Sequence, residues 1–304
     1  MSGYPETRPE SRAERPPEER YARPAERNVL RPEAAPGLSP RRRGMFLLPS
    51  LFTAGNIGAG YFAITQSLQG SALEPRHFDY AALAIGFAIP FDAIDGRIAR
   101  MTHTTSEFGK ELDSLADVIT FGVAPSLLAY TWGFHMLPSS MNATLHQKLV
   151  ELGAFACFLF LLCGAARLAR FNSTAAPKPK NPGRPGQKYF VGMPIPAAAG
   201  AIAAVVHFFS GIPVAVHWVA ALWMAYVVSI GLLMVSTWRF WSGKEINLSR
   251  RHGFRWIVLL GLFLYSLVFF SQYLLATIAL TYAFSGVLAR LAYSWQRKSL
   301  RSAA

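Results

Sequence analysis

The sequence predicts an all-α protein, a polytopic membrane helix bundle of about eight transmembrane helices. Hydrophobic residues make up 52% of the 304 residues, charged residues only 15%, and the mean hydropathy is positive at +0.26. This composition argues against a soluble protein. Apolar stretches of roughly 18 to 22 residues recur from Met45 onward, long enough to cross a hydrocarbon core of about 30 Å as helices. Basic residues cluster between alternate stretches, as in membrane proteins.

Residues 1–44 are predicted to form a disordered cytoplasmic tail rich in Arg, Pro and Glu. Its ten arginines are partly offset by seven glutamates, and it has few large apolar residues and no helical or strand period. The run Arg41, Arg42 and Arg43 ends the tail directly before the first apolar stretch. No cleavable signal peptide is expected, because the apolar stretch begins late and no small-residue cleavage site follows it.

Eight spans are predicted in order, and an even number places both termini on one side of the membrane. They cover residues 45–66, 79–99, 115–135, 150–169, 193–211, 214–236, 256–273 and 275–293. Short connections around Gly211 and Gln272 predict helical hairpins for spans five and six and for spans seven and eight.

The basic residues predict the orientation of the bundle. The formal charge is +13, from 30 Lys and Arg against 17 Asp and Glu. With the N-terminus in the cytoplasm, only Arg76 and Lys148 fall on the outer side, as the positive-inside rule requires. The charge therefore records orientation, and no nucleic-acid partner is expected. Cys157 and Cys163 lie within one apolar stretch and predict neither a disulfide framework nor a metal site.

Four aspartates at the cytoplasmic boundary carry the strongest functional signal. Asp92 and Asp95 are three residues apart near the end of span two. Asp113 and Asp117 are four apart near the start of span three, so each pair shares one helix face. The polar stretch 101–108 lets the two helices turn, so that the four carboxylates converge. Such a cluster needs bound cations or protons, and ligation by oxygen alone favours Mg²⁺ or Mn²⁺ where phosphate is involved.

By spacing alone, two other interpretations of the aspartates stay open. One is a solvated acidic rim, in which the aspartates of span three favour its helix dipole. The other is a divalent-cation carrier, which predicts acidic or polar residues in the middle of several spans. The clustering at one boundary weighs against that carrier. No Ser/His/Asp arrangement is apparent in the sequence.

Polar residues on other spans are candidates for the same pocket. Thr53 and Asn56 lie within the apolar span one, where they either face the pocket or hydrogen-bond between packed helices. Arg167 and Arg170 share one face at the end of span four. They either follow the positive-inside rule alone or bind donor phosphates or an acceptor carboxylate.

The segment from Asp92 to Asp117 fits the pattern D-x2-D-G-x2-A-R-x8-G-x3-D-x3-D without a departure. This pattern resembles the signature of the CDP-alcohol phosphatidyltransferases, integral membrane enzymes that move a phosphatidyl or related group from a CDP-linked donor to an alcohol. The resemblance implies a six-helix core over residues 45–244. Residues 245–304, with the last two spans and a short basic tail, would then be an additional helical hairpin.

Further stretches resemble the bacterial membrane-embedded phosphatidylserine synthases of this family. They are LLPSLFTAGNIGAGYFAI, SEFGKELDSLADVITFGVAPSLLAY, CGAARLARFN and VGMPIPAAAG. The resemblance implies transfer of the phosphatidyl group from CDP-diacylglycerol to the hydroxyl of L-serine, giving phosphatidylserine and CMP in phospholipid biosynthesis. It also implies a homodimer among the lipids of the bacterial cytoplasmic (inner) membrane, with the active site in the cytoplasm. Glycerol 3-phosphate or an inositol compound is the alternative acceptor.

The resemblance also implies roles for individual residues. One or two Mg²⁺ or Mn²⁺ ions would be held by Asp92, Asp95, Asp113 and Asp117, and Asp117 would also be the general base. Gly96, Ala99, Arg100 and Gly109 would contact the CDP group and its phosphates. Thr53 and Asn56 of span one, and Arg167 and Arg170 as binders of the acceptor or phosphate, are candidates from their own chemistry and position and not from the resemblance.

Overall fold

The computed structural model describes residues 40–101, 107–138, 143–173, 189–241 and 253–302. The predicted tail lies outside these ranges except for residues 40–44. Within the described ranges, side chains are not described for residues 40–50, 95, 98–101, 253–257, 291, 292 and 294–302.

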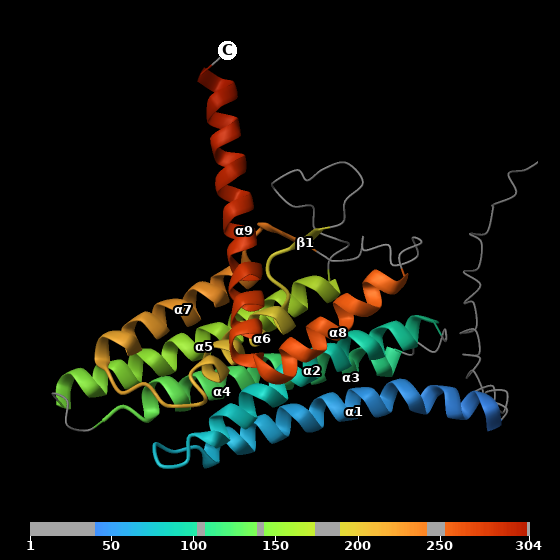
Figure 1. The fold of residues 1–304 in the computed structure, drawn as a ribbon, viewed down its shortest axis with the longest axis horizontal. Helices are drawn as coiled ribbons and strands as arrows, with labels where there is room; N and C mark the ends of the chain where they lie inside the picture. The colour runs from blue at the N-terminus through green and yellow to red at the C-terminus, as the bar shows by residue number, and fades with distance from the viewer. Residues whose placement is uncertain (1–39, 102–106, 139–142, 174–188, 242–252, 303–304) are drawn as a thin grey trace, which may run out of the picture.

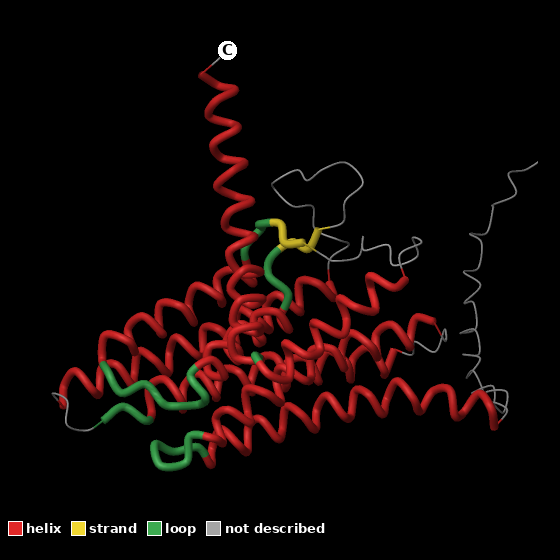
Figure 2. The backbone as a smooth tube through the Cα atoms, viewed as in Figure 1, coloured by secondary structure: helices red, strands yellow, loops and turns green. Residues whose placement is uncertain are grey.

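Within the described residues the chain forms eight helical segments, and Figure 2 shows that helix dominates the fold. The third segment is continuous but changes its winding along its length. The bounds are α1 (Pro40–Gln69), α2 (Arg76–Met101), the third segment with α3 (Glu107–Asp117), η1 (Val118–Val123), α4 (Ala124–Tyr130) and η2 (Thr131–His135), then α5 (Ala143–Ser173), α6 (Ile195–Phe208), α7 (His217–Val235), α8 (Gly253–Phe269) and α9 (Ser271–Ser302). Each predicted span falls on one of them, which confirms the all-α membrane helix bundle.

Four of these helices are long and apolar enough to cross a membrane. They are Glu107–His135, Ala143–Ser173, His217–Val235 and Ser271–Arg290. Two further apolar helices, Ile195–Phe208 and Val258–Phe269, are shorter. A helix must be about 20 residues long to span the hydrocarbon core, so these segments identify a membrane protein.

The helix α6 lies at the centre of the bundle and packs against α2 and α9 (Figure 1). Its residues are buried around most of its circumference, including Ala198, Ala199, Ala201 and Ile202. A helix that is apolar all round belongs in an interior, and its small side chains let neighbouring helices approach closely. α1 packs along α2, and α5 along α7, so α6 joins two helix pairs.

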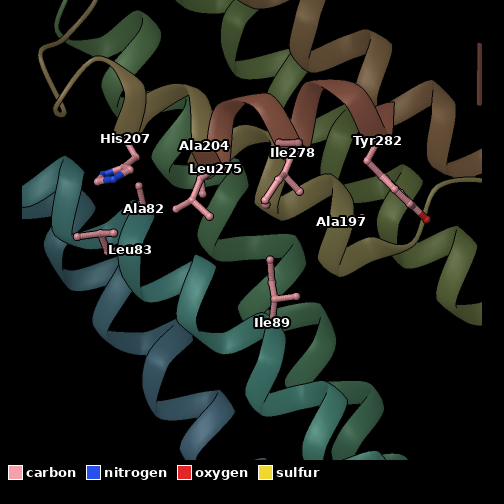
Figure 3. A pocket seen from close by; sticks show the side chains of 12 residues that line it. Ala82, Leu83, Ile89, Ala197, Ala204, His207, Leu275, Ile278 and Tyr282 are labelled. Carbon is pink, nitrogen blue, oxygen red and sulfur yellow. The ribbon is translucent and has the colours of Figure 1, made fainter. Parts of the chain in front are cut away.

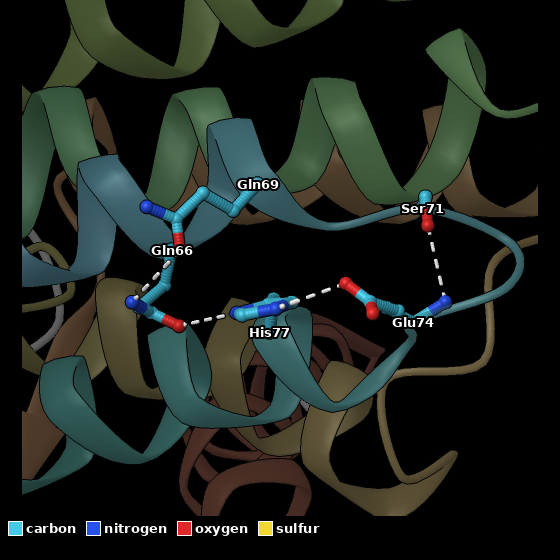
Figure 4. A network of polar contacts seen from close by, with 5 residues as sticks. All are labelled: Gln66, Gln69, Ser71, Glu74 and His77. Atoms are coloured by element: carbon cyan, nitrogen blue, oxygen red, sulfur yellow. Dashed lines mark hydrogen bonds and ion pairs between the residues drawn. The ribbon is translucent and has the colours of Figure 1, made fainter.

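A polar network closes the turn between α1 and α2 at the end of the bundle away from Asp92 (Figure 4). The Ser71 hydroxyl accepts a 3.0 Å hydrogen bond from the Glu74 N–H. His77 lies 2.7 Å from the Gln66 amide oxygen and 3.4 Å from the Glu74 carboxylate. Gly211, in the turn before α7, has a φ of +74° and touches the Pro75 carbonyl so closely that a Cβ there would overlap it. The two turns at this end are thus packed together.

Three helices are connected at the same end by a polar triad around the buried His207. His207 of α6 lies with Nδ1 2.6 Å from the Asp79 carboxylate of α2 and Nε2 2.9 Å from the Ser271 hydroxyl of α9. The Asp79 carboxylate accepts a hydrogen bond from the Nδ1–H group, which leaves Nε2 to accept a hydrogen bond from the Ser271 hydroxyl. This Ser/His/Asp arrangement is not apparent in the sequence. The three residues lie on helices that are far apart in the sequence, so they form no recognisable sequence motif.

Two short strands at the other end link the helices that end there. β1 (Tyr189–Val191) pairs antiparallel with β2 (Arg239–Trp241). Arg239 lies over the Tyr189 ring, 5.2 Å from its centroid, a cation–π contact. These strands connect the chain before α6 to the chain after α7. They were not predicted from the sequence.

The two C-terminal helices differ in how they meet the bundle. Phe270 alone separates α8 from α9, and most of the described α8 side chains are exposed. α9 packs more on α6 and β2 than on α8, and its Ala276 and Ala283 are buried. Figure 1 shows its C-terminal half rising away from the other helices. The eighth span therefore does not simply return along the seventh, because α6 offers it a larger packing surface.

Candidate active site at the aspartate end of the bundle

Close packing between α1 and η1 positions the first side chain of the site. A Cβ on Gly60 would lie 2.6 Å from the Thr120 hydroxyl oxygen and 2.9 Å from the Thr120 Cα, so only glycine fits. The buried Thr120 hydroxyl in turn donates a 2.9 Å hydrogen bond to the Asn56 carbonyl. This hydrogen bond fixes the position of Asn56 along the third helical segment.

Asn56 faces the aspartates from α1. Its amide nitrogen donates to the Asp92 carboxylate at 3.5 Å. Asn56 is only 1% exposed, and Thr53 one turn earlier is also buried. The two interpretations of Asn56 are therefore compatible, since the residue hydrogen-bonds across helices and does so with a carboxylate of the site. The amide oxygen of Asn56 is buried without a hydrogen-bond partner among the described residues.

Three of the four aspartates interact in the structure. Asp92 of α2 interacts electrostatically with Asp113 and through a side-chain hydrogen bond with Asp117, both on α3. All three residues are partly buried. Asp117 ends α3, and the helix continues as the wider π-helical turns of η1. Such π segments are often found at functional sites.

The remaining signature residues are placed by their backbone or lie partly outside the described side chains. Asp95, Ala99 and Arg100 continue α2, but their side chains are not described. Gly96 on α2 and Gly109 on α3 are both partly exposed. The structure thus brings Asp92, Asp113 and Asp117 together, and leaves the roles of the other signature residues as predictions.

Arg167 and Arg170 have different surroundings although they share a helix face. Arg167 interacts electrostatically with Asp117 and with Tyr282 of α9. Its Nε is buried without a hydrogen-bond partner among the described residues. Arg170 donates from Nη1 to the carbonyl of Val235, the last residue of α7, at 3.3 Å. A guanidinium there satisfies a C-terminal carbonyl and favours the helix dipole. Only Arg167 therefore faces the aspartates.

Two further groups of residues lie beside the site and were not predicted from the sequence. The Tyr282 hydroxyl donates to the Trp241 carbonyl of β2 at 3.1 Å, which brings α9 next to Arg167. Asn172, near the end of α5, donates to the Ser114 hydroxyl of α3 at 2.9 Å. Tyr282 lies beyond the part of the chain that carries the family resemblance, so no motif pointed to it. An Asn or Ser alone carries no signal in the sequence.

The composition of the site suits a hard divalent cation. Its donors are carboxylate oxygens and the buried amide oxygen of Asn56, which are the ligands that Mg²⁺ and Mn²⁺ prefer. Among the described side chains, which exclude Asp95, no group of three His, Cys, Asp or Glu residues is arranged as a metal site. The predicted ligand set therefore stays a prediction.

Comparison with known proteins adds an independent line of evidence. Residues 46–231 match the model of the CDP-alcohol phosphatidyltransferase family. The chain is 36% identical over 210 residues to the CDP-diacylglycerol–serine O-phosphatidyltransferase of Helicobacter pylori, covering 67% of this chain and 75% of that protein. The enzymes of the same name from Mycobacterium leprae and Bacillus subtilis are 30% and 34% identical, over 80% and 51% of this chain and 74% and 72% of theirs.

The matched region contains all four aspartates of the signature and the two helices that hold them, α2 and α3. It also covers more than half of the chain. The chain therefore belongs to the CDP-alcohol phosphatidyltransferase family.

Proposed function

We propose that this protein transfers the phosphatidyl group of CDP-diacylglycerol to the hydroxyl of L-serine, giving phosphatidylserine and CMP. The observation that carries the proposal is the meeting of Asp92, Asp113 and Asp117 at one end of the bundle, inside the region matched to the family. Serine as the acceptor is supported by the names of the relatives. The donor is a lipid, so a site at the ends of membrane helices lets its nucleotide reach water while its acyl chains stay in hydrocarbon.

The family is generally dependent on divalent cations. For this chain we propose one or two Mg²⁺ or Mn²⁺ ions, held by Asp92, Asp95, Asp113 and Asp117. Ions bound there would neutralise charge that develops on the phosphoryl oxygens and on the departing CMP. The buried amide oxygen of Asn56 is a neutral donor next to the same carboxylates.

Asp117 is the proposed general base. A serine hydroxyl is a poor nucleophile near neutral pH, so a carboxylate must take its proton as the oxygen attacks phosphorus. Asp117 lies where α3 passes into η1 and interacts with Arg167. That guanidinium supplies positive charge beside the reacting groups and is suited to the serine carboxylate or a donor phosphate.

The donor nucleotide is proposed to lie along α2 and the start of α3. Gly96 and Gly109 would admit the cytidine diphosphate close to the backbone. Ala99 and Arg100 would contact the same group from α2, and Thr53 and Asn56 from α1. The partial exposure of both glycines supports this placement.

We place the enzyme in the bacterial cytoplasmic membrane as a homodimer, with both termini and the aspartates on the cytoplasmic side. The bias of Lys and Arg supports this orientation. Single cysteines at Arg76 and Arg239, introduced into a variant with Cys157 and Cys163 replaced by Ala, test it with a membrane-impermeant maleimide on intact cells. Labelling at residue 239 instead of 76 would contradict it. Cross-linking in native membranes tests the dimer, and only monomers at every cross-linker concentration would contradict it.

The activity is tested with purified protein, CDP-diacylglycerol, and Mg²⁺ or Mn²⁺. Serine, glycerol 3-phosphate and inositol are supplied in turn, and CMP release and the lipid product are measured. Serine should give CMP and phosphatidylserine in equal amounts, and the other acceptors should give none. No CMP with any acceptor would remove the enzymatic proposal, and release with glycerol 3-phosphate alone would assign the alternative acceptor.

The metal ligands are tested separately from the base. Asp113→Ala should weaken donor binding and raise the metal concentration needed for half-maximal activity. Mutating a residue that only supports a metal ligand typically lowers metal affinity or activity 10- to 100-fold, and loss of a ligand itself should cost at least as much. The half-maximal metal concentration should therefore rise about 100-fold. An unchanged metal titration would contradict the assignment.

A further inference from the structure

An apolar groove of about 280 Å³ lies between α2, α6 and α9 (Figure 3). α2 contributes Leu83 and Ile89, α6 contributes Gly200 and Ala204, and α9 contributes Leu275 and Ala279. Small residues on α6 form its floor, and larger aliphatic residues form its sides. Leu83 is 39% exposed, so the groove is open at this residue to the surroundings of the helices.

One end of the groove reaches the candidate active site. Ile89 lies three residues before Asp92, on the same face of α2. Tyr282, which also lines the groove, interacts with Arg167, and Arg167 interacts with Asp117. The end of the groove at Ile89 and Tyr282 therefore lies next to the residues proposed to hold the donor headgroup.

The other end of the groove is closed by a polar group. His207 lines it there, held by Asp79 and Ser271. From Ala197 to His207 the wall formed by α6 rises about 15 Å, about half of a 30 Å hydrocarbon core. The groove is thus an apolar slot with a charged site at one end and a polar stop at the other.

We propose that this groove holds one acyl chain of the CDP-diacylglycerol donor, and that α9 makes the enzyme sensitive to the length of that chain. The inference rests on the proposed function, because a donor with its diphosphate at the aspartates must lay its chains along apolar surface starting there. A chain that fills the slot buries apolar area along its whole length, whereas a short chain leaves the end near His207 empty. α9 lies outside the residues matched to the family model.

A bulkier side chain at the closed end tests the length dependence. Leu275→Trp fills the part of the groove near His207, and Leu280→Trp, on the exposed side of α9, is its matched control. For Leu275→Trp, kcat/KM with dipalmitoyl CDP-diacylglycerol should fall about tenfold. This factor corresponds to the binding free energy lost when about two methylene groups of the acyl chain are no longer buried. With the dioctanoyl donor kcat/KM should change less than about twofold, and Leu280→Trp should match wild type with both. An equal loss with both donors, or no loss, would overturn the proposal.

A binding experiment separates this inference from the proposed function. CDP-diacylglycerol with a diazirine near the end of one chain is photolysed with the wild-type protein, and the labelled peptides are identified by mass spectrometry. Label should appear on α9 around Leu275 and should be displaced by unlabelled CDP-diacylglycerol but not by phosphatidylglycerol. Equal displacement by both lipids, or no label on α9, would show that the groove does not hold the donor chain. Catalysis is not needed for this result, so an inactive protein would count only against the proposed function.

Discussion

The two ends of the helix bundle both place an aspartate of α2 against other helices, but in opposite chemical surroundings. At one end, the Asp79 carboxylate is hydrogen-bonded to His207, and His207 is hydrogen-bonded to the Ser271 hydroxyl. At the other end, Asp92 meets two further carboxylates, Asp113 and Asp117. The first cluster pairs a donor with every acceptor along its length, whereas the second gathers groups of like charge.

This difference separates a structural cluster from a functional one. Buried polar groups that satisfy one another stabilise a fold, since each replaces a hydrogen bond to water. Like-charged groups at membrane depth do not stabilise the fold, and they are retained where a ligand supplies the missing charge. Near Asp92, the Asn56 amide oxygen and the Arg167 Nε are also buried without hydrogen-bond partners among the described residues. We therefore assign stability to the His207 end and chemistry to the Asp92 end.

The largest expected effect comes from removing the proposed base. Asp117→Asn keeps the shape of the side chain but cannot take a proton, so kcat should fall about 10³-fold, within the range typical of general bases. CDP-diacylglycerol affinity should change only a few-fold. Asp79→Asn at the opposite end of the bundle is the matched control and should retain kcat within about threefold, as an exchange remote from the reacting groups. Full activity of Asp117→Asn would remove this residue from the mechanism.

A smaller effect is expected from the neutral side chain that supports the carboxylates. Asn56→Ala removes the donor to Asp92, and such supporting contacts typically contribute 10- to 100-fold to metal affinity or activity. The half-saturating Mn²⁺ concentration should rise by about that factor. Ser67→Ala, at an equally buried polar residue of α1 that bonds only to the Ala63 carbonyl, should leave it unchanged. Equal metal titrations for both variants would show that Asn56 only packs helices.

The two arginines of α5 should separate under the same substitution. Arg167→Gln removes the charge beside Asp117, and kcat/KM should fall about tenfold or more, as for loss of one hydrogen bond to a charged group. Arg170→Gln removes the bond to the Val235 carbonyl, so it should lower the melting temperature while kcat/KM stays within about threefold, since that bond lies at a helix end. Equal kinetic losses would place both arginines at the substrate.

The sequence predicted the helices well because apolar length is a local property. Runs of apolar residues cannot stay in water and need no partner to be recognised. The strands Tyr189–Val191 and Arg239–Trp241 escaped prediction because three residues carry no period and their pairing joins distant segments. The contact of α9 with α6 escaped for a related reason, since its residues are apolar on many faces and do not indicate which neighbour they meet.

The site was predictable in part for the same reason. The spacing of Asp113 and Asp117 fixes their common face, and the family pattern identified both residues. Which polar residues of other helices face them is a property of packing, so Asn56 was left with two interpretations and Tyr282 was not considered. The Asp79, His207 and Ser271 cluster joins residues 128 and 64 positions apart. Single histidines and serines at such separations carry no signal.

The smallest expected effect on catalysis, and the clearest on stability, lies at the His207 end. His207→Leu leaves the Asp79 carboxylate without its nearest partner, which should cost about 2 kcal/mol of stability, typical of a lost hydrogen bond to a charged group. Adding Asp79→Leu should recover most of that loss, because the carboxylate is removed together with its partner and only the partly exposed Ser271 hydroxyl loses its hydrogen bond. Thermal unfolding in detergent measures both variants, and kcat/KM with the dioctanoyl donor, whose short chain leaves the end of the groove near His207 empty, should stay near wild type in each. If the double variant were instead less stable than the single one, the triad would contribute more than mutual satisfaction. A loss of turnover in both would mean that the two ends of the bundle are not separate in function.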